Sequence, residues 1–335
     1  MIRRRNFIKS LALATSSILM PSVLSSRNSE EEDKFGMLLP KRLLGKTGQY
    51  VTMLGVGGYH VGWTTEKNAQ EVIETAIEGG IRFFDSAESY SKGESERRYG
   101  KYLVPKYRNH VFIMTKSTAA DRKTALAHLE GSLKRLKCDY IDLWQVHALK
   151  DPGDVDKRIE NEVLEVFEKA KSQGKVKHIG FTGHANPFAH KRMFERTKGK
   201  DILETVQMPV NAIDPHFFSF IENVFPEALR RDFGILAMKT LSDGRFFKEK
   251  RMLERIPWQT DNPLVPDIIS VKEALSFVWS LPVSVLITGA ENRGLLMEKI
   301  ALAGEFSKLT EEGRKNILEK AASFAGNKVE YYKKV

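Results

Sequence analysis

The stretch Gly80-Ile-Arg-Phe-Phe-Asp85-Ser-Ala-Glu-Ser-Tyr90 decides the fold expected for this chain. Its apolar run ends at an aspartate, and a tyrosine follows a few residues later. Two further apolar runs lead into Lys116 and His147 in a similar way. Short apolar runs of this kind are typical of buried parallel strands. An aspartate, a tyrosine, a lysine and a histidine at successive strand ends therefore predict a proton-transfer set on one face of a barrel.

Strand-like and helix-like segments alternate along the chain, which is typical of repeated βα units. The expected strands are Thr52–Val56, Arg82–Phe84, Val111–Thr115, Ile141–Val146, Val176–Thr182, Glu204–Met208, Gly234–Lys239 and Ser284–Thr288. The expected helices cover residues 67–79, 94–103, 121–137, 160–173, 187–197, 219–231, 268–281 and 291–303. This strict alternation predicts an α/β fold of the (β/α)8 TIM-barrel class. Gly48 and its neighbours suggest an N-terminal β-hairpin, and the amphipathic stretch from Leu309 to Val335 suggests a C-terminal helical tail packed outside the barrel.

The chain resembles the aldo-keto reductase superfamily over roughly residues 41–303. The matching segments include Arg42-Leu-Leu-Gly-Lys-Thr-Gly48, Leu54-Gly-Val-Gly-Gly58, Phe84-Asp-Ser-Ala-Glu-Ser-Tyr90, Gly93-Glu-Ser-Glu96, Gly174-Lys-Val-Lys-His-Ile-Gly180, Ala237-Met-Lys239 and Ile287-Thr-Gly-Ala290. The resemblance implies a hairpin that closes the floor of the barrel. It also implies a nicotinamide-dependent oxidoreductase that interconverts a carbonyl, from an aldehyde, ketone or sugar, and an alcohol.

The resemblance gives each of the four polar residues a role. A free tyrosine has a pKa of about 10, and a nearby ammonium group lowers it. Tyr90 is thus the expected general acid and base, and Lys116 the cation that tunes it. Asp85 holds Lys116 by an ion pair, and His147 orients the carbonyl oxygen.

The resemblance also implies a nicotinamide dinucleotide bound across the C-terminal face of the barrel. Its expected contacts are Gly58, Tyr59, Thr182, Gln207, Met238, Lys239, Leu241, Gly289, Arg293 and Glu298. The chain departs from the family where Gly183 replaces an asparagine and where Met238 or Lys239 replaces a stacking aromatic. Gly289, Ala290 and Leu295 replace residues that meet the 2′-phosphate of NADP. The cofactor is therefore expected to be NADP or NAD, with NADP slightly favoured.

The N-terminus predicts an export signal. Arg4-Arg5-Asn-Phe-Ile-Lys9 precedes an apolar stretch and resembles a twin-arginine signal. Residues 1–25 are expected to be this signal, 26–37 a charged linker and 38–335 the barrel with its C-terminal helix. The expected location is the periplasm, with a membrane tether if the signal stays uncleaved. The expected partners are the twin-arginine export machinery and a small carbonyl or alcohol substrate.

Other function classes fit the sequence less well. The net charge of +10 is spread over mixed acidic and basic segments, which does not favour nucleic-acid binding. The histidines lack metal-ligand spacing, so no metal is expected. The single cysteine, Cys138, allows no disulfide within this sequence.

Two alternatives stay open: a phosphate-binding barrel isomerase or aldolase, and a nucleotide-binding barrel that acts as a sensor without turnover. The expected assembly is a monomer or a small homo-oligomer. The long segment 241–267 is expected to lie over the cofactor or substrate.

Overall fold

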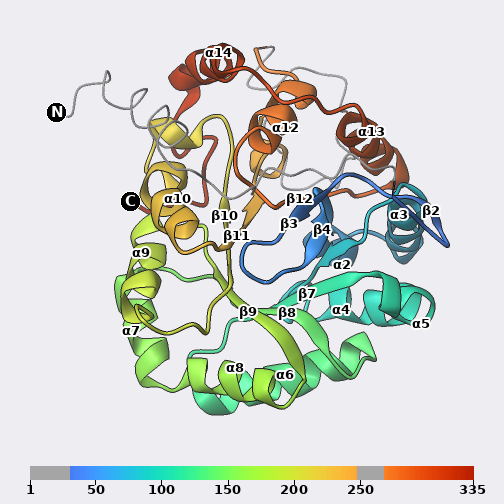
Figure 1. The fold of residues 1–335 in the computed structure, drawn as a ribbon, viewed down its shortest axis with the longest axis vertical. Coiled ribbons are helices and arrows are strands. Elements are labelled where there is room, and N and C mark those ends of the chain that lie inside the picture. Colours follow the sequence, from blue (N-terminus) through green and yellow to red (C-terminus); the bar gives the residue numbers. More distant parts are fainter. Residues whose placement is uncertain (1–30, 247–267) are drawn as a thin grey trace.

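A computed structural model describes residues 31–246 and 268–335 (Figure 1). Eight parallel strands close into a barrel in the order β5-β6-β7-β8-β9-β10-β11-β12. They are β5 (Leu54–Gly57), β6 (Phe83–Asp85), β7 (Phe112–Ser117), β8 (Ile141–Val146), β9 (Val176–Thr182), β10 (Thr205–Pro209), β11 (Gly234–Met238) and β12 (Val285–Thr288). The predicted (β/α)8 class is confirmed. Each predicted strand lies within two residues of the observed one, because each is an apolar run buried on both faces.

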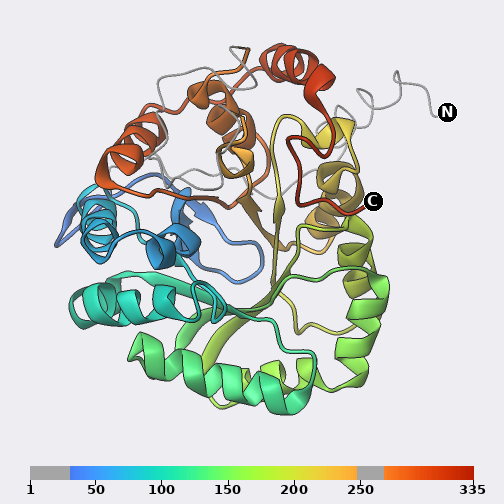
Figure 2. The ribbon, with the colours of Figure 1, turned by 180° about the vertical axis from the view of Figure 1, so that it is seen from behind.

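Helices surround the barrel, as both views show (Figures 1 and 2). They are α2 (Gly58–Trp63), α3 (Glu66–Glu78), α4 (Glu94–Arg98), α5 (Val104–Tyr107), α6 (Arg122–Leu136), α7 (Pro152–Glu160), α8 (Val163–Ser172), α9 (Pro187–Arg196), α10 (Phe220–Arg230), α12 (Val271–Trp279), α13 (Arg293–Gly304) and α14 (Glu311–Ala321). In the described part of the chain, no helix combines the length and apolar character that a membrane span requires.

The structure differs from the predicted helices at several places, and the short helices α2 and α5 have no predicted counterpart. Residues 94–103 were expected to form one helix, but the last part, Tyr99–Leu103, forms a π-helical turn. Helix α7 precedes the expected helix 160–173 and was not predicted. Its start carries a recognisable signal, because Asp151 accepts a hydrogen bond from Asp154 N and Pro152 occupies the first turn.

Two hairpins precede the barrel. The first, β1 (Glu32–Asp33) with β2 (Gly36–Met37), lies in a segment expected to be a charged linker. Arg82 fixes it there through two bonds to Asp33, each 2.8 Å. The second hairpin pairs β3 (Lys41–Leu43) with β4 (Tyr50–Thr52), as predicted around Gly48.

The second hairpin closes the floor of the barrel. Its fully buried Leu44 packs with Phe83, Met114 and Leu236, which belong to barrel strands, in one apolar cluster. Gly234 gives Leu44 its space, because a Cβ at this position would lie 2.6 Å from Leu44 Cδ1. The hairpin therefore seals the end of the barrel at which the strands begin, and the opposite face carries the loops that follow the strands.

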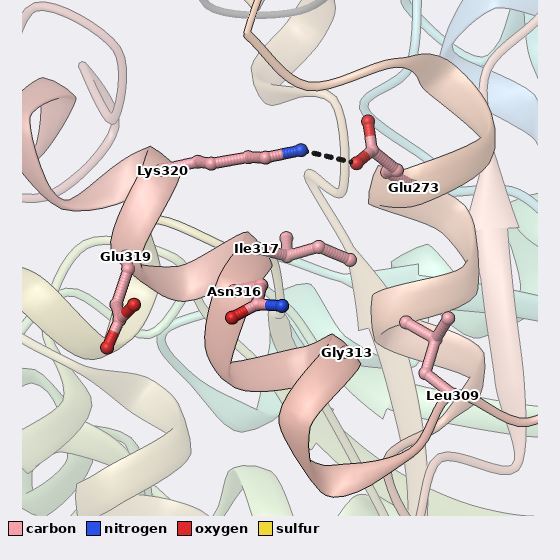
Figure 3. Close-up of a pocket in the computed structure, with 7 residues that line it drawn as sticks. All are labelled: Glu273, Leu309, Gly313, Asn316, Ile317, Glu319 and Lys320. Carbon is pink, nitrogen blue, oxygen red and sulfur yellow. Dashed lines mark hydrogen bonds and ion pairs between the residues drawn. The ribbon is translucent and has the colours of Figure 1, made fainter.

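The C-terminal tail is only partly helical. Helix α14 packs beside α12 on the outside of the molecule, with a cavity of about 480 Å³ between them that Glu273, Ile317 and Lys320 help to line (Figure 3). After a short 3-10 turn at Ala322–Phe324, the chain continues without regular structure to Val335. This last segment runs back beside the loops that precede α9 and α10 (Figure 2).

Candidate active site

Lys116 joins the predicted catalytic residues. It lies near the end of β7, is buried, and forms an ion pair with Asp85 at the end of β6. Lys116 Nζ also donates to the Ser86 carbonyl oxygen at 2.7 Å and to the Tyr90 hydroxyl oxygen at 3.0 Å. Adjacent parallel strands set this geometry, because Asp85 pairs with Met114 in the β6–β7 register. Three of the four predicted residues thus share one hydrogen-bonded group.

Burial and charge act in opposite directions on these three groups. Burial raises the pKa of Asp85 above its ordinary value, and Lys116 offsets part of the rise. Burial alone would lower the pKa of Lys116, yet Asp85 and Tyr90 raise it overall, so the side chain stays protonated. Burial raises the pKa of Tyr90, and Lys116 lowers it by less. The expected tuning by the ammonium is therefore present, but the net pKa of Tyr90 lies above its ordinary value.

His147 lies beside the Tyr90 ring. The ring centroids are 5.7 Å apart, and the planes are inclined by 79°. Burial, helped by Lys116, lowers the pKa of His147 well below its ordinary value, so the imidazole is neutral at neutral pH. Arg158 on α7 donates to the His147 carbonyl oxygen at 2.9 Å and so fixes its backbone. His147 Nδ1 is buried and meets no hydrogen-bond partner among the described residues.

The loop that carries Tyr90 is held by residues that the sequence did not single out. The Ser86 and Ser95 hydroxyls lie 2.7 Å apart, which ties the loop to α4. Glu88 accepts hydrogen bonds from Thr118 N at 2.9 Å and from Thr118 Oγ1 at 2.5 Å. His128 Nδ1 lies 3.4 Å from the same carboxylate. Serines, a glutamate and a threonine are common on surfaces, and only their contacts show that they position Tyr90.

Gly58 is required for close packing behind the candidate catalytic residues. A Cβ on Gly58 would lie 2.1 Å from the Asp85 carbonyl oxygen. Its neighbour Tyr59 is half exposed, and the Tyr59 ring meets the Tyr90 ring edge-on at 5.6 Å. Gly58 and Tyr59, which were predicted to contact the cofactor, therefore lie beside the candidate catalytic residues Asp85 and Tyr90.

Thr182 and Gln207 lie side by side. They are direct partners in the β9–β10 register, and both are buried. Gln207 Oε1 has no hydrogen-bond partner within residues 31–246 and 268–335. A buried amide oxygen without a partner costs about 1–3 kcal/mol, so a bound group that donates a hydrogen bond here stabilises the site.

The loop after β11 carries the next predicted cofactor residues. Met238 and Lys239 are half-buried, and Leu241 packs against the main apolar core. Lys239 has φ +58°, and Asp243 has φ +56°, both in the left-handed region that costs energy for side chains with a Cβ. Such strain is often found at ligand-binding loops. Thr240 Oγ1 is buried there and has no partner among the described residues.

The remaining predicted residues follow β12. The His60 ring covers Gly289 so closely that a Cβ would lie 2.1 Å from His60 Nδ1. Glu298 Oε2 is buried on α13 without a partner in the described part of the chain. Arg293 is more than half exposed at the start of α13, with a guanidinium nitrogen 4.0 Å from Glu78. The structure thus places Arg293 at the outer surface beside α3.

Trp144 on β8 is fully buried and stacks on Phe167 at 3.7 Å between ring centroids, so it belongs to the core. Trp258 and residues 247–267 lie outside the described residues. No group of three His, Cys, Asp or Glu side chains in the described ranges is arranged to hold a metal ion.

Two curated bacterial proteins resemble this chain in sequence. The oxidoreductase YrpG of Bacillus subtilis is 31% identical over 230 residues, which span 60% of this chain and 66% of YrpG. The aldo-keto reductase YhdN of the same organism is 31% identical over 185 residues, or 50% of this chain and 53% of YhdN. The chain thus spans only about half to two thirds of these two relatives.

Solved structures share the fold. An aldo-keto reductase of Bacillus halodurans in its holo form has a TM-score of 0.69 at 22% identity, covering 86% of this chain and 98% of that one. An aldo-keto reductase of Klebsiella pneumoniae in complex with NADPH has a TM-score of 0.65 at 20% identity, covering 84% and 94%. The aldo/keto reductase family model matches residues 53–328, most of the barrel and part of the tail. The chain therefore belongs to the aldo/keto reductase family.

Proposed function

We propose that this protein is a nicotinamide-dependent oxidoreductase that interconverts a carbonyl and an alcohol. The observation that carries the proposal is the contact of Lys116 Nζ with both Asp85 and the Tyr90 hydroxyl at the ends of β6 and β7. The neutral ring of His147 beside Tyr90 completes the arrangement. Family membership supports the same reaction class.

The residues of the chain perform the proton transfer. Tyr90 donates its hydroxyl proton to the carbonyl oxygen during reduction and takes it back during oxidation. Lys116 stabilises the phenolate that this transfer leaves, and Asp85 holds the lysine in place. His147, neutral through burial, donates a hydrogen bond to the substrate oxygen and shares its developing charge.

The residues present fit a nicotinamide cofactor. The unsatisfied Gln207 Oε1, with Thr182 as its neighbour in the register, suits a carboxamide group that donates a hydrogen bond. The buried Glu298 Oε2 suits an amino group of adenine. When bound, such a cofactor supplies or accepts the hydride. An NADPH complex of a protein with this fold supports the assignment.

Replacing Tyr90 by phenylalanine tests the proposal. Tyr90→Phe removes the proton donor, so carbonyl reduction should fall by about 10²–10⁴ while cofactor affinity stays within about threefold. Tyr102→Phe is a matched control, since its hydroxyl bonds to Glu66 at 2.6 Å on the outer surface. Steady-state kinetics and cofactor titration by fluorescence give both values. An unchanged kcat in Tyr90→Phe would rule out this tyrosine as the acid.

We also propose that the protein discriminates weakly between NADP and NAD. Gly289, Ala290 and Leu295 offer no cation or hydroxyl for a 2′-phosphate, and Arg293 lies exposed beside Glu78. The ratio of the two affinities should stay below about a thousandfold, or roughly 4 kcal/mol. Arg293→Ala should reduce NADP affinity if this residue contacts the phosphate. A ratio above a thousandfold in the parent protein would show a phosphate clamp elsewhere.

We propose in addition that the protein is exported after folding, with its cofactor already bound. The support is the Arg4-Arg5-Asn-Phe-Ile-Lys9 segment, since twin-arginine signals direct the export of folded chains. Replacing Arg4 and Arg5 by lysine should leave the protein in the cytoplasm. Protein recovered from the periplasm should release one equivalent of nicotinamide dinucleotide on denaturation, measured by mass spectrometry. Recovery of the parent protein only in the cytoplasm contradicts this proposal.

A further inference from the structure

The last residues of the chain reach the mouth of the barrel, although the sequence predicted an outer helix there. Asn211, after β10, links the two parts. Its side-chain amide donates to Glu330 Oε1 at 3.1 Å, to the Tyr332 hydroxyl at 3.0 Å and to the Lys239 carbonyl oxygen at 3.4 Å. The Lys334 backbone N–H donates to the Ala185 carbonyl oxygen at 2.8 Å. We call residues 329–334 the tail segment.

A buried ion cluster locks the tail segment in place. Lys333 Nζ contacts Asp214 Oδ1 at 2.7 Å and Glu330 Oε2 at 2.8 Å, and all three side chains have no solvent exposure. The same nitrogen donates to the Phe217 carbonyl oxygen at 2.6 Å. Breaking a buried pair of this kind is costly, so the tail segment has a fixed position against the loop after β10.

The locked tail segment presents two tyrosines to the active-site face. The Tyr332 ring meets the His184 ring edge-on at 5.9 Å, and His184 is close enough to His147 to lower its pKa. The Tyr331 hydroxyl accepts a hydrogen bond from Lys239 Nζ at 3.0 Å and donates one to Asp243 Oδ2 at 3.3 Å. The Arg245 guanidinium lies 4.3 Å from the centre of the Tyr331 ring. Tyr331 thus fixes the position of the Lys239 side chain.

Lys239 keeps donors available for a ligand. Its ammonium group has three N–H donors, and within the described residues the Tyr331 oxygen is the one acceptor bonded to it. Burial lowers the pKa of Lys239, and the nearby Asp243 carboxylate opposes this change. Asp243 Oδ1 lies 3.7 Å from His60 Nε2, the His60 and Tyr59 ring centroids are 5.5 Å apart, and Tyr59 borders Tyr90 at 5.6 Å. Within the described residues, the Lys239 ammonium therefore keeps two N–H donors, and Asp243, His60 and Tyr59 connect it to Tyr90.

We propose that Lys239, held by Tyr331 of the tail segment, binds an anionic group on the substrate. The sequence placed Lys239 at the cofactor, and this inference assigns it to the substrate. The preferred substrates are carbonyl compounds or alcohols that carry a carboxylate or phosphate away from the reacting carbon. The inference rests on the proposed oxidoreductase function and names its substrate class.

Pairs of aldehydes that differ only in charge test the inference. Succinic semialdehyde is compared with its methyl ester, and 4-carboxybenzaldehyde with methyl 4-formylbenzoate. In each pair, the parent protein should show a kcat/KM at least about tenfold higher for the acid, as expected for a hydrogen bond to a charged group. The preference should lie mainly in KM, because Lys239 contacts a part of the substrate that does not react.

Variants assign the preference to its residues. Lys239→Met should abolish the preference for the acids, and Lys239→Arg should retain part of it. Tyr331→Phe removes the hydroxyl that holds Lys239 and keeps the ring beside Arg245, so the preference should fall several-fold. The controls are Tyr102→Phe and Lys320→Met, which removes the outer pair with Glu273 at 2.9 Å (Figure 3). Both should keep the preference of the parent protein.

The outcomes separate this inference from the function on which it rests. Parent protein that reduces the esters as well as the acids overturns the anionic subsite and leaves the oxidoreductase in place. If Lys239→Met keeps the preference but weakens NADPH or NADH binding about tenfold, Lys239 binds the cofactor phosphates instead, and the inference is overturned. Parent protein that reduces none of the four aldehydes overturns the proposed substrate class, whereas the proposed function is decided separately by the comparison of Tyr90→Phe with the parent protein. Thermal unfolding of each variant shows that the fold is retained.

Discussion

At the scale of single residues, Lys116 organises the candidate active site. It contacts Asp85, the Ser86 carbonyl oxygen and Tyr90, and these contacts need its full length and charge. Because these side chains are buried, removing one of them leaves a charge or a hydrogen-bonding group of the others without a partner. Residue substitutions here should therefore change catalysis as well as stability.

Replacing Lys116 and Asp85 should change the pH dependence by different amounts. In the proposed mechanism, reduction requires protonated Tyr90, so the rate should fall as pH rises through the pKa of this tyrosine. Lys116→Met removes the cation that lowers this pKa, so the falling limb should move to higher pH and kcat should drop about 10²-fold or more. Asp85→Asn should do less, since Asp85 acts through Lys116. The pH profile of kcat/KM measures both effects.

Lys175→Met serves as the control, because it removes an exposed ion pair with Glu130 at 2.5 Å. Its profile should match that of the parent protein. If neither Lys116→Met nor Asp85→Asn moves the limb, Tyr90 is tuned by another group.

Buried histidines should make the fold sensitive to mild acid. Burial lowers the pKa of the fully buried His190 to about 4. Its folded pKa is therefore below the ordinary value of about 6.5, and the unfolded chain binds the proton more tightly. The stability from this group is complete above about pH 6.5 and decreases as pH falls toward 4. Between pH 7 and pH 5, the proton that the unfolded chain binds at His190 should lower the free energy of unfolding by about 2 kcal/mol.

Urea denaturation at several pH values measures this effect. His190→Gln should flatten the dependence between pH 7 and pH 5, although it also changes the contact with the Gln207 carbonyl oxygen at 3.3 Å. A parent protein equally stable at both pH values would show that His190 is not buried in its neutral form.

At the scale of elements, the β3–β4 hairpin gives the barrel its closed floor. Leu44 has no solvent exposure and packs with residues of several strands. A backbone bridge between Gly45 and Phe233 joins the hairpin to the start of β11. The hairpin thus excludes solvent from the inner side chains at the floor of the barrel.

Shortening Leu44 should destabilise the barrel. Leu44→Ala leaves a cavity in this cluster and should cost about 2–5 kcal/mol, as buried leucines generally do. Leu126→Ala on α6 is the control, because Leu126 is 41% exposed. Urea denaturation of both variants should give a large loss for the first and less than about 1 kcal/mol for the second. Equal losses would show that the hairpin does not close the core.

At the scale of the whole molecule, the β3–β4 hairpin and the tail segment lie at opposite ends of the barrel. The β3–β4 hairpin seals the floor, and the tail segment borders the face that carries Tyr90 and His147. Residues far apart in sequence, such as Asp214 and Lys333, meet only because the barrel is closed. The fold and the candidate substrate site are therefore coupled through the C-terminus.

Replacing Lys333 should test this coupling. Lys333→Met leaves the buried carboxylates of Asp214 and Glu330 without their cation and should cost about 3–5 kcal/mol. Burial already raises the pKa of Glu330 and Lys333 offsets part of the rise, so without the lysine protonation of this carboxylate relieves part of the cost. The loss should be smaller at pH 5 than at pH 8, measured by thermal or urea unfolding. A loss that does not depend on pH would show that the carboxylates are not left buried and charged.

The sequence by itself determined the barrel and the candidate residues that meet on one of its faces. The eight apolar runs bury both faces of parallel strands, and this pattern is local, so the strands lay within two residues of their expected positions. Asp85, Lys116 and His147 follow such runs directly, and parallel strands end on one face. Their meeting with Tyr90 was therefore predictable, as was the hairpin near Gly48.

Only the tertiary structure decided which residues hold the candidate site in position and which residues border it. The balance between burial and charge that raises the pKa of Tyr90 depends on three-dimensional surroundings. Arg158 reaches His147 from α7, and Lys333 finds Asp214 across more than a hundred residues. A lysine in an amphipathic tail is typical of a solvated helix face, and no local pattern distinguishes it from a buried anchor. Long-range contacts of this kind arise from the closure of the barrel, which the periodicity of a single segment does not encode.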